Sequence, residues 1–218
     1  MTDKRSHIIR VWDIPTRAFH WLLVALIAFL WWSGENHKLE WHKLAGFGVA
    51  ALLVFRLFWG FFGAGTARFS HFLRGPRAIW RYLRGRLDVI GHNPLGAWSV
   101  VALLSLTAIE TYFGLFAIDE DGLESGPFAP MLSFDSARQS AHVHSLLFNW
   151  LLGLIGLHIA AIAFYTLSGT NLVGPMLTGR ARVSDQAQEP HTGSIVALLI
   201  GLVLAGATFY LLWWYDNR

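Results

Sequence analysis

Residues 141–167 read A-H-V-H-S-L-L-F-N-W-L-L-G-L-I-G-L-H-I-A-A-I-A-F-Y-T-L, with His144 and His158 fourteen residues apart. An α-helix turns about 100° and rises about 1.5 Å per residue. Fourteen residues therefore return to within about 40° of the same face, about 21 Å further along the axis. An apolar run of this length crosses a bilayer, where an ionisable side chain is costly and is a functional candidate. The stretch predicts a membrane-spanning helix that carries two functional imidazoles on one face, at two depths.

The composition of the whole chain is typical of an integral membrane protein. Of its 218 residues, 54% are hydrophobic and only 14% are charged, whereas about 25% of a soluble domain is charged. The chain contains no cysteine, which excludes disulfides, cysteine-ligated iron–sulfur clusters and the covalent attachment of c-type haem. We therefore expect one helical bundle in the membrane, with histidine as the ligand of any haem.

The apolar stretches predict an all-α integral membrane fold with five spans, at about residues 15–34, 41–62, 94–117, 141–167 and 194–214. The first four spans lie within residues 1–182, and residues 183–218 supply a linker and a fifth transmembrane helix. Asp13 with Pro15 predicts the start of the first helix, because such residues cap a helix and fill its first turn.

The distribution of Lys and Arg predicts the orientation of the chain, because loops on the inner side of a membrane carry an excess of both. The segments on the side of the N-terminus hold most of these residues, and the opposite segments hold only Lys38, Lys43, Arg138 and Arg218. We therefore expect the N-terminus inside and the C-terminus outside.

The long inner loop and the outer loop carry opposite charge. Within residues 75–86, Arg77, Arg81 and Arg84 share one face at helical spacing, which predicts a helix lying on the anionic inner leaflet. Contact of this helix with membrane lipid explains the excess of Lys and Arg over Asp and Glu, without a role in binding nucleic acid. The loop between the third and fourth spans is acidic and contains Asp119, Glu120, Asp121, Glu124 and Asp135.

The histidines of the spans fall into two levels. His42 lies near the outer end of the second span, at the level of His144, and His20 lies near the inner end of the first span, at the level of His158. Each level holds two imidazoles from different helices, as a six-coordinate haem iron with two axial histidines requires. The histidines predict two haem b groups, an outer one held by His42 and His144 and an inner one held by His20 and His158.

His142 is a rival to His144 for the outer level. It stands sixteen residues before His158, which places it about 160° around the helix, on the opposite face. The spacing therefore favours His144.

Two arginines lie near the inner level. Arg56 follows His42 by fourteen residues, and Arg17 precedes His20 by one turn. Each guanidinium either pairs with a haem propionate or extends to the membrane surface, and the sequence leaves both interpretations open.

Three polar residues of the third span have two interpretations each. His92 and Asn93 are candidates for contact with a quinone head group, while Asn93 followed by Pro94 also suffices as a helix start. Glu110 either carries protons within the span or reaches the outer interface.

Five motifs resemble the bacterial cytochrome b561 and nickel–iron hydrogenase b-type cytochrome family. They are V-W-D-I-P-T-R-A-F-H-W at residues 11–21, W-H-K-L-A-G-F-G at 41–48, R-L-F-W-G-F-F-G-A-G-T-A-R-F at 56–69, G-H-N-P-L-G-A at 91–97 and N-L-V-G-P-M-L-T-G-R at 171–180. The paired histidines of the fourth span are also similar to those of the formate dehydrogenase gamma subunit. The resemblance covers about residues 8–182, and the fifth helix and the long acidic loop depart from the simplest members.

The resemblance implies a diheme cytochrome of a bacterial inner membrane, in which a four-helix transmembrane, haem-binding bundle within residues 1–182 holds two b haems. In such a membrane the orientation predicted from Lys and Arg gives a cytoplasmic N-terminus and a periplasmic C-terminus. It implies electron transfer between a periplasmic redox protein and quinone, which binds as a substrate. The redox protein would be a c-type cytochrome, a dehydrogenase or a hydrogenase. The implied haem ligands are His20, His42, His144 and His158. Two other functions stay open, a stand-alone superoxide:quinone oxidoreductase and a haem-free membrane anchor or transporter subunit.

Overall fold

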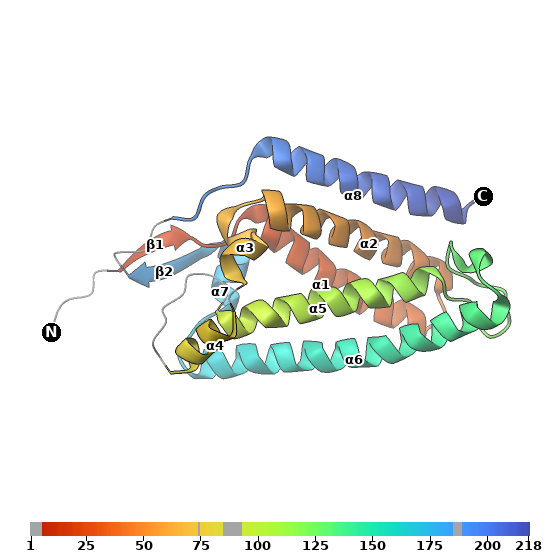
Figure 1. Ribbon diagram of the computed structural model, residues 1–218, viewed down its shortest axis with the longest axis horizontal. Coiled ribbons are helices and arrows are strands. Elements are labelled where there is room, and N and C mark those ends of the chain that lie inside the picture. The colour runs from red at the N-terminus through yellow and green to blue at the C-terminus, as the bar shows by residue number, and fades with distance from the viewer. Residues whose placement is uncertain (1–5, 74, 85–92, 185–188) are drawn as a thin grey trace. The chain divides into compact units, whose positions relative to one another are not determined.

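The computed structural model describes residues 6–73, 75–84, 93–184 and 189–218, and its elements are labelled in Figure 1. Five helices within these residues are long and apolar enough to cross a membrane, and they are α1 (Ile14–Glu35), α2 (Leu39–Phe62), α5 (Pro94–Leu115), α6 (Phe134–Leu167) and α8 (Ile195–Asp216). A helix pairs its backbone groups internally, so it suits apolar segments in lipid. The mostly helical membrane class and the five spans predicted from the sequence are confirmed.

Short elements connect the long helices. They are β1 (Ser6–Arg10), the 3-10 turn η1 (Gly65–Ala67), α3 (Phe69–Phe72), α4 (Pro76–Leu83), the 3-10 turn η2 (Ala129–Met131), α7 (Val173–Thr178) and β2 (Arg180–Ser184). Helix α4 forms where the basic amphipathic helix is expected, with Arg77, Arg81 and Arg84 all exposed. The Arg84 guanidinium lies over the ring of Trp80, 4.3 Å from its centre.

Side-chain caps fix the starts of α1 and α5 as the sequence predicts. The Thr16 N–H donates to Asp13 Oδ1 at 3.0 Å, and the Gly96 N–H donates to Asn93 Oδ1 at 2.7 Å. Each cap satisfies a backbone donor that has no partner inside its own helix. The second carboxylate oxygen of Asp13 accepts the Trp59 indole N–H at 2.8 Å, so the α1 cap also contacts α2.

Helix α6 begins at Phe134, seven residues before the predicted start at residue 141. The additional residues, F-D-S-A-R-Q-S, are mostly polar, so a search for apolar runs does not include them. Ser133 supplies the start, because its carbonyl accepts the Ala137 N–H at 2.9 Å and its hydroxyl accepts the Ser136 N–H at 3.3 Å. The helix therefore extends beyond the predicted apolar span at its N-terminal end.

A two-stranded sheet is present that the sequence did not predict. Strand β1 pairs antiparallel with β2, with Ser6 opposite Ser184 and Arg10 opposite Arg180, and the two strands lie side by side in Figure 1. Each strand has five residues, too few for a clear alternating pattern. The adjoining core contains buried Ile9, Val11 and Trp12, with Met176, Ala181 and Val183 packed against it.

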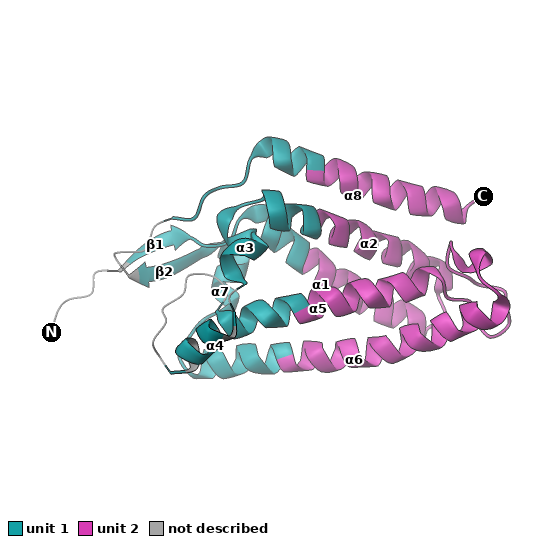
Figure 2. Ribbon diagram, in the orientation of Figure 1, with its two compact units in different colours: residues 1–20, 56–101, 158–200 teal, residues 21–55, 102–157, 201–218 magenta. Residues whose placement is uncertain are grey.

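The chain divides into two compact units, shown in teal and magenta in Figure 2. The first unit contains residues 1–20, 56–101 and 158–200, and the second contains residues 21–55, 102–157 and 201–218. Each long helix contributes to both units. His20 and His158 belong to the first unit, whereas His42 and His144 belong to the second.

Candidate functional site

The second unit brings together the imidazoles of His42 on α2 and His144 on α6. Their ring centres are 6.0 Å apart, and the ring planes are nearly perpendicular, at 87°. Both side chains are half-buried, whereas His142 on the same helix as His144 is exposed. The structure therefore places His144, rather than its rival His142, beside His42.

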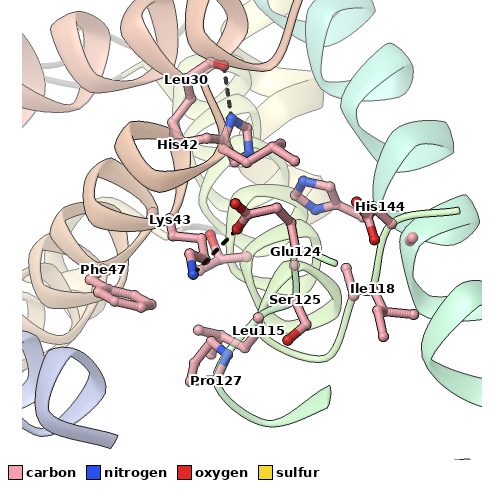
Figure 3. A pocket seen from close by; sticks show the side chains of 18 of the residues that line it. Leu30, His42, Lys43, Phe47, Leu115, Ile118, Glu124, Ser125, Pro127 and His144 are labelled. Carbon is pink, nitrogen blue, oxygen red and sulfur yellow. Dashed lines mark hydrogen bonds and ion pairs between the residues drawn. The ribbon is translucent and has the colours of Figure 1, made fainter. Parts of the chain in front are cut away.

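A backbone carbonyl fixes the orientation of the His42 ring. Its Nδ1–H donates to the Leu30 carbonyl oxygen at 3.0 Å, as the dashed line in Figure 3 shows. A carbonyl oxygen only accepts hydrogen bonds, so Nδ1 carries the hydrogen and Nε2 of the neutral ring carries the lone pair. Nε2 is then the nitrogen of His42 that can bind a metal.

His144 is held in the same way by α5. Its Nδ1 lies 3.0 Å from the Glu110 carbonyl oxygen and 3.1 Å from the Glu110 carboxylate oxygen Oε1. Both atoms accept the Nδ1–H, which again leaves the lone pair on Nε2. The ring also packs against Gly114, one turn after Glu110, where an added Cβ would lie 2.9 Å from His144 Cε1. Gly114 therefore makes room for this imidazole.

Two cavities of the second unit are lined by the imidazole pair. Their volumes are about 210 and 250 Å³. Both are lined by Leu30, Leu39, His42, Glu110 and His144. The first cavity also reaches Gly46, one turn after His42, where an added Cβ would meet nothing within 4 Å. Both rings thus line open volume, and Figure 3 shows one of the cavities with both rings at its wall.

This arrangement fits a haem held by two axial histidines. A bond between a metal and an imidazole nitrogen is about 2 Å long, so two such bonds across one metal place the ring centres about 6 Å apart. The observed separation is 6.0 Å. The cavities lined by both rings provide open volume beside the pair. The carbonyl partners at Nδ1 are the second contacts that metal-binding histidines usually make.

The described residues contain no group of three or more His, Cys, Asp or Glu side chains placed to hold a bare metal ion. A haem iron needs only two protein ligands, because the porphyrin nitrogens occupy the remaining positions. The two imidazoles of His42 and His144 are therefore enough protein ligands for one haem iron.

The first unit contains the other predicted pair. His20 on α1 and His158 on α6 both belong to this unit, and both side chains are half-buried. Next to His20, Phe19 is buried and lies beneath the Arg56 guanidinium, 6.0 Å from it. The unit thus combines two imidazoles with a buried cation.

The two candidate arginines have different surroundings. Arg56 is only 3% exposed, so it does not extend to the surface; it donates to the Ala67 carbonyl at 3.1 Å and lies 4.8 Å above the Phe69 ring. Arg17 is half-buried and donates to the Leu177 carbonyl at the end of α7. Within the first unit, Arg56 thus connects α2 to η1 and α3, and Arg17 connects α1 to α7.

Of the two candidates for quinone contact, His92 lies outside the described residues. Asn93 Oδ1 caps α5 by accepting the Gly96 N–H, and the Asn93 side-chain Nδ2 donates to the Tyr165 hydroxyl at 3.1 Å. The structure therefore supports the interpretation of Asn93 as a helix start and adds Tyr165 as its neighbour.

Sequence reasoning missed two features of the site. One is the contact of Gly114 with His144. The four-residue spacing of Glu110 and Gly114 was a signal for it, because residues four apart share a helix face. The other is Lys43, which lines the first cavity. Its Nζ lies 3.3 Å from Glu40 and Asp216 and 3.7 Å from Glu124, and the last contact is drawn in Figure 3.

Comparison with known proteins adds one finding. The family model described as prokaryotic cytochrome b561 matches residues 11–179, which is most of the chain. No curated protein and no solved structure matches the chain. The matched region includes all four paired histidines and the first four long helices. Together with the five apolar helices, it shows that this multi-pass bacterial membrane protein belongs to the prokaryotic cytochrome b561 family, whose members are b-type membrane cytochromes acting in electron transfer.

Proposed function

We propose that the protein is a diheme b-type cytochrome that transfers electrons between a periplasmic redox partner and the membrane quinone pool. The observation that carries the proposal is the His42–His144 pair, with ring centres 6.0 Å apart and each Nδ1–H donated to a backbone carbonyl. Such contacts fix the tautomer that binds iron and hold the ring in position before the cofactor binds. The family membership supports electron transfer as the chemistry.

In this proposal each histidine pair holds one haem. His42 and His144 hold the outer haem, on the periplasmic side, and His20 and His158 hold the inner haem, on the cytoplasmic side of an inner membrane protein. The haem iron supplies one-electron chemistry by alternating between the ferric and ferrous states. The chain would provide the imidazole nitrogens and orient them. Residues 1–182 form the haem-binding core, and residues 183–218 add a linker and α8.

We propose Arg56 and Arg17 as the groups that bind the propionates of the inner haem. A guanidinium has five N–H donors, so a hydrogen bond to Ala67 or Leu177 leaves donors for a carboxylate. The position of Arg56 above Phe19, the neighbour of His20, supports this assignment. A buried guanidinium also favours a negative partner in a medium where charge is poorly solvated.

Quinone is proposed to bind beside the inner haem, near His92 and Asn93. Asn93 bonds to the hydroxyl of Tyr165, which lies two turns after the proposed ligand His158 on α6. An amide and a hydroxyl are both able to donate to a quinone carbonyl. This part of the proposal depends on the inner haem being present.

The haem content of the purified protein tests the proposal. We expect two haem b groups per chain by absorbance of the pyridine complex after extraction, and a reduced-minus-oxidised spectrum of the b type. The haems should be extractable with acidic acetone, because the chain has no cysteine for covalent attachment. If the purified protein were colourless and bound no added haem, the proposal would be contradicted. That result would favour an anchor or transporter subunit.

The proposed partner docks on the acidic loop of the second unit, where Glu120 and Asp121 are exposed. A basic c-type cytochrome is the probe. Charge attraction accelerates encounter between such proteins. Raising the ionic strength from about 0.01 to about 1 M shortens the Debye length from about 30 to about 3 Å. We therefore expect the second-order rate of electron transfer between the protein and the basic cytochrome to fall by about tenfold or more. A rate independent of salt in stopped-flow mixing would rule out docking by charge.

A further inference from the structure

Glu110 is a largely buried carboxylate within α5 of the second unit. Its side chain is 12% exposed and it lines both cavities beside the His42–His144 pair. Its Oε1 lies 3.1 Å from His144 Nδ1, and the carbonyl oxygen of the same residue lies 3.0 Å from that nitrogen. One residue thus offers the ring two acceptors, of which only one is charged.

A carboxylate in this position is costly to bury unless a positive group lies near it. The lysine that lines the first cavity, Lys43, forms ion pairs with Glu40, Glu124 and Asp216. The Glu110 carboxylate contacts the His144 imidazole. A ferric iron bound at Nε2 of this ring would place a positive charge one imidazole away from the carboxylate. The location of Glu110 is therefore suited to compensate the charge of an oxidised haem.

We propose that Glu110 is a positioning residue for the outer haem and that its negative charge lowers the reduction potential of that haem. The inference rests on the proposed function, since it requires a haem between His42 and His144. The carboxylate strengthens the Nδ1–H bond and so raises the basicity of the coordinating Nε2. Both the stronger ligand and the nearby negative charge stabilise the ferric state more than the ferrous state.

Glu110→Gln separates this effect from a merely structural one. Glutamine keeps the size of the side chain and an acceptor oxygen, and the backbone carbonyl of residue 110 still orients His144. Only the charge is removed. We expect the variant to retain two haems, while at a fixed ambient potential the ratio of reduced to oxidised outer haem rises about tenfold. For a one-electron couple this ratio corresponds to a potential about 59 mV higher.

The measurement is a spectroelectrochemical titration of the full-length protein, in which the outer haem is the component missing from His144→Ala. Glu40→Gln is the matched control, because it removes the same charge from a side chain that is 73% exposed. Water and salt screen that position, so its effect on the outer potential should be much smaller. If the Glu110→Gln variant loses the outer haem, the Glu110→Asp variant is measured in its place. The shorter side chain moves the negative charge away from His144 Nδ1, so the potential of the outer haem should rise, but by less than expected for Glu110→Gln.

The role of Glu110 would be overturned if the potential of the outer haem in Glu110→Gln equalled that of the wild-type protein. The same outcome in Glu110→Asp would overturn it where that variant is needed. A shift of the same size in Glu40→Gln would also overturn it, because the effect would then not be local. Absence of the outer haem from the wild-type protein would instead refute the proposed function, so the two failures are distinguishable.

Discussion

Replacing His144 with alanine is expected to reduce the haem content of the purified protein from two groups per chain to one. The imidazole supplies one of only two protein ligands to the proposed outer haem, and alanine has no group that binds iron. The remaining ring, His42, is 6.0 Å away in the structure and cannot hold both axial positions. Haem content per chain, from absorbance after extraction, measures the effect.

His142→Ala is the matched control for this prediction. His142 lies two residues before His144 on the same helix, and its side chain is exposed. Its removal deletes the same chemical group without touching the pair, so two haems per chain should remain. A loss of haem in His142→Ala with normal content in His144→Ala would reverse the assignment of the outer ligand.

A side chain at position 114 is expected to displace the His144 ring and weaken the outer haem. An ideal Cβ at Gly114 lies 2.9 Å from His144 Cε1 and 3.1 Å from its Nδ1, closer than packed atoms tolerate. Gly114→Val should therefore push the ring away from the Glu110 acceptors. Overpacking costs about 1–3 kcal/mol, so we expect haem affinity at this site to fall by about fivefold to a hundredfold, as measured by haem transfer to apomyoglobin.

Gly153→Val controls for the helix propensity of valine. Gly153 lies nine residues after His144 on α6, about 180° around the helix, and a Cβ there meets nothing within 4 Å. This variant should keep both haems and the rate of haem loss of the wild-type protein. Equal haem loss from the two valine variants would show that the contact between Gly114 and His144 is not responsible.

The spans and their caps were predictable because their signals are local. A continuous apolar run marks a membrane helix, and Asp13 and Asn93 stand directly before the helices that they cap. The seven polar residues at the start of α6 carry no such apolar signal, and Ser133 alone marks the true start. The β1–β2 pair joins two segments at opposite ends of the family region, a separation that no local pattern reveals.

The location of His144, rather than His142, beside His42 was also predictable, since helical periodicity alone separates the two residues. The contacts that hold the ring were not. Glu110 is visible in the sequence as an ionisable residue in a span, but its partner comes from another helix and depends on how α5 and α6 pack within the second unit. The same holds for Leu30, whose apolar side chain gives no sign that its carbonyl orients His42.

Arg56 shows how packing decides between two interpretations that a sequence leaves open. A position near the end of a span is compatible with a side chain that reaches the membrane surface. In the structure the guanidinium is enclosed by Phe19, Phe69 and the Ala67 carbonyl and is 3% exposed. Its burial depends on the segment after α2, which folds back over the helix end as η1 and α3.

The central claim is that two separate histidine pairs hold two haems, one in each unit. Redox titration of His144→Ala beside His158→Ala tests it most directly. The wild-type protein should titrate in two components, with His144→Ala retaining one of them and His158→Ala retaining the other. If both variants lost the same component, or if both kept two, the assignment of His42 with His144 and of His20 with His158 would be contradicted.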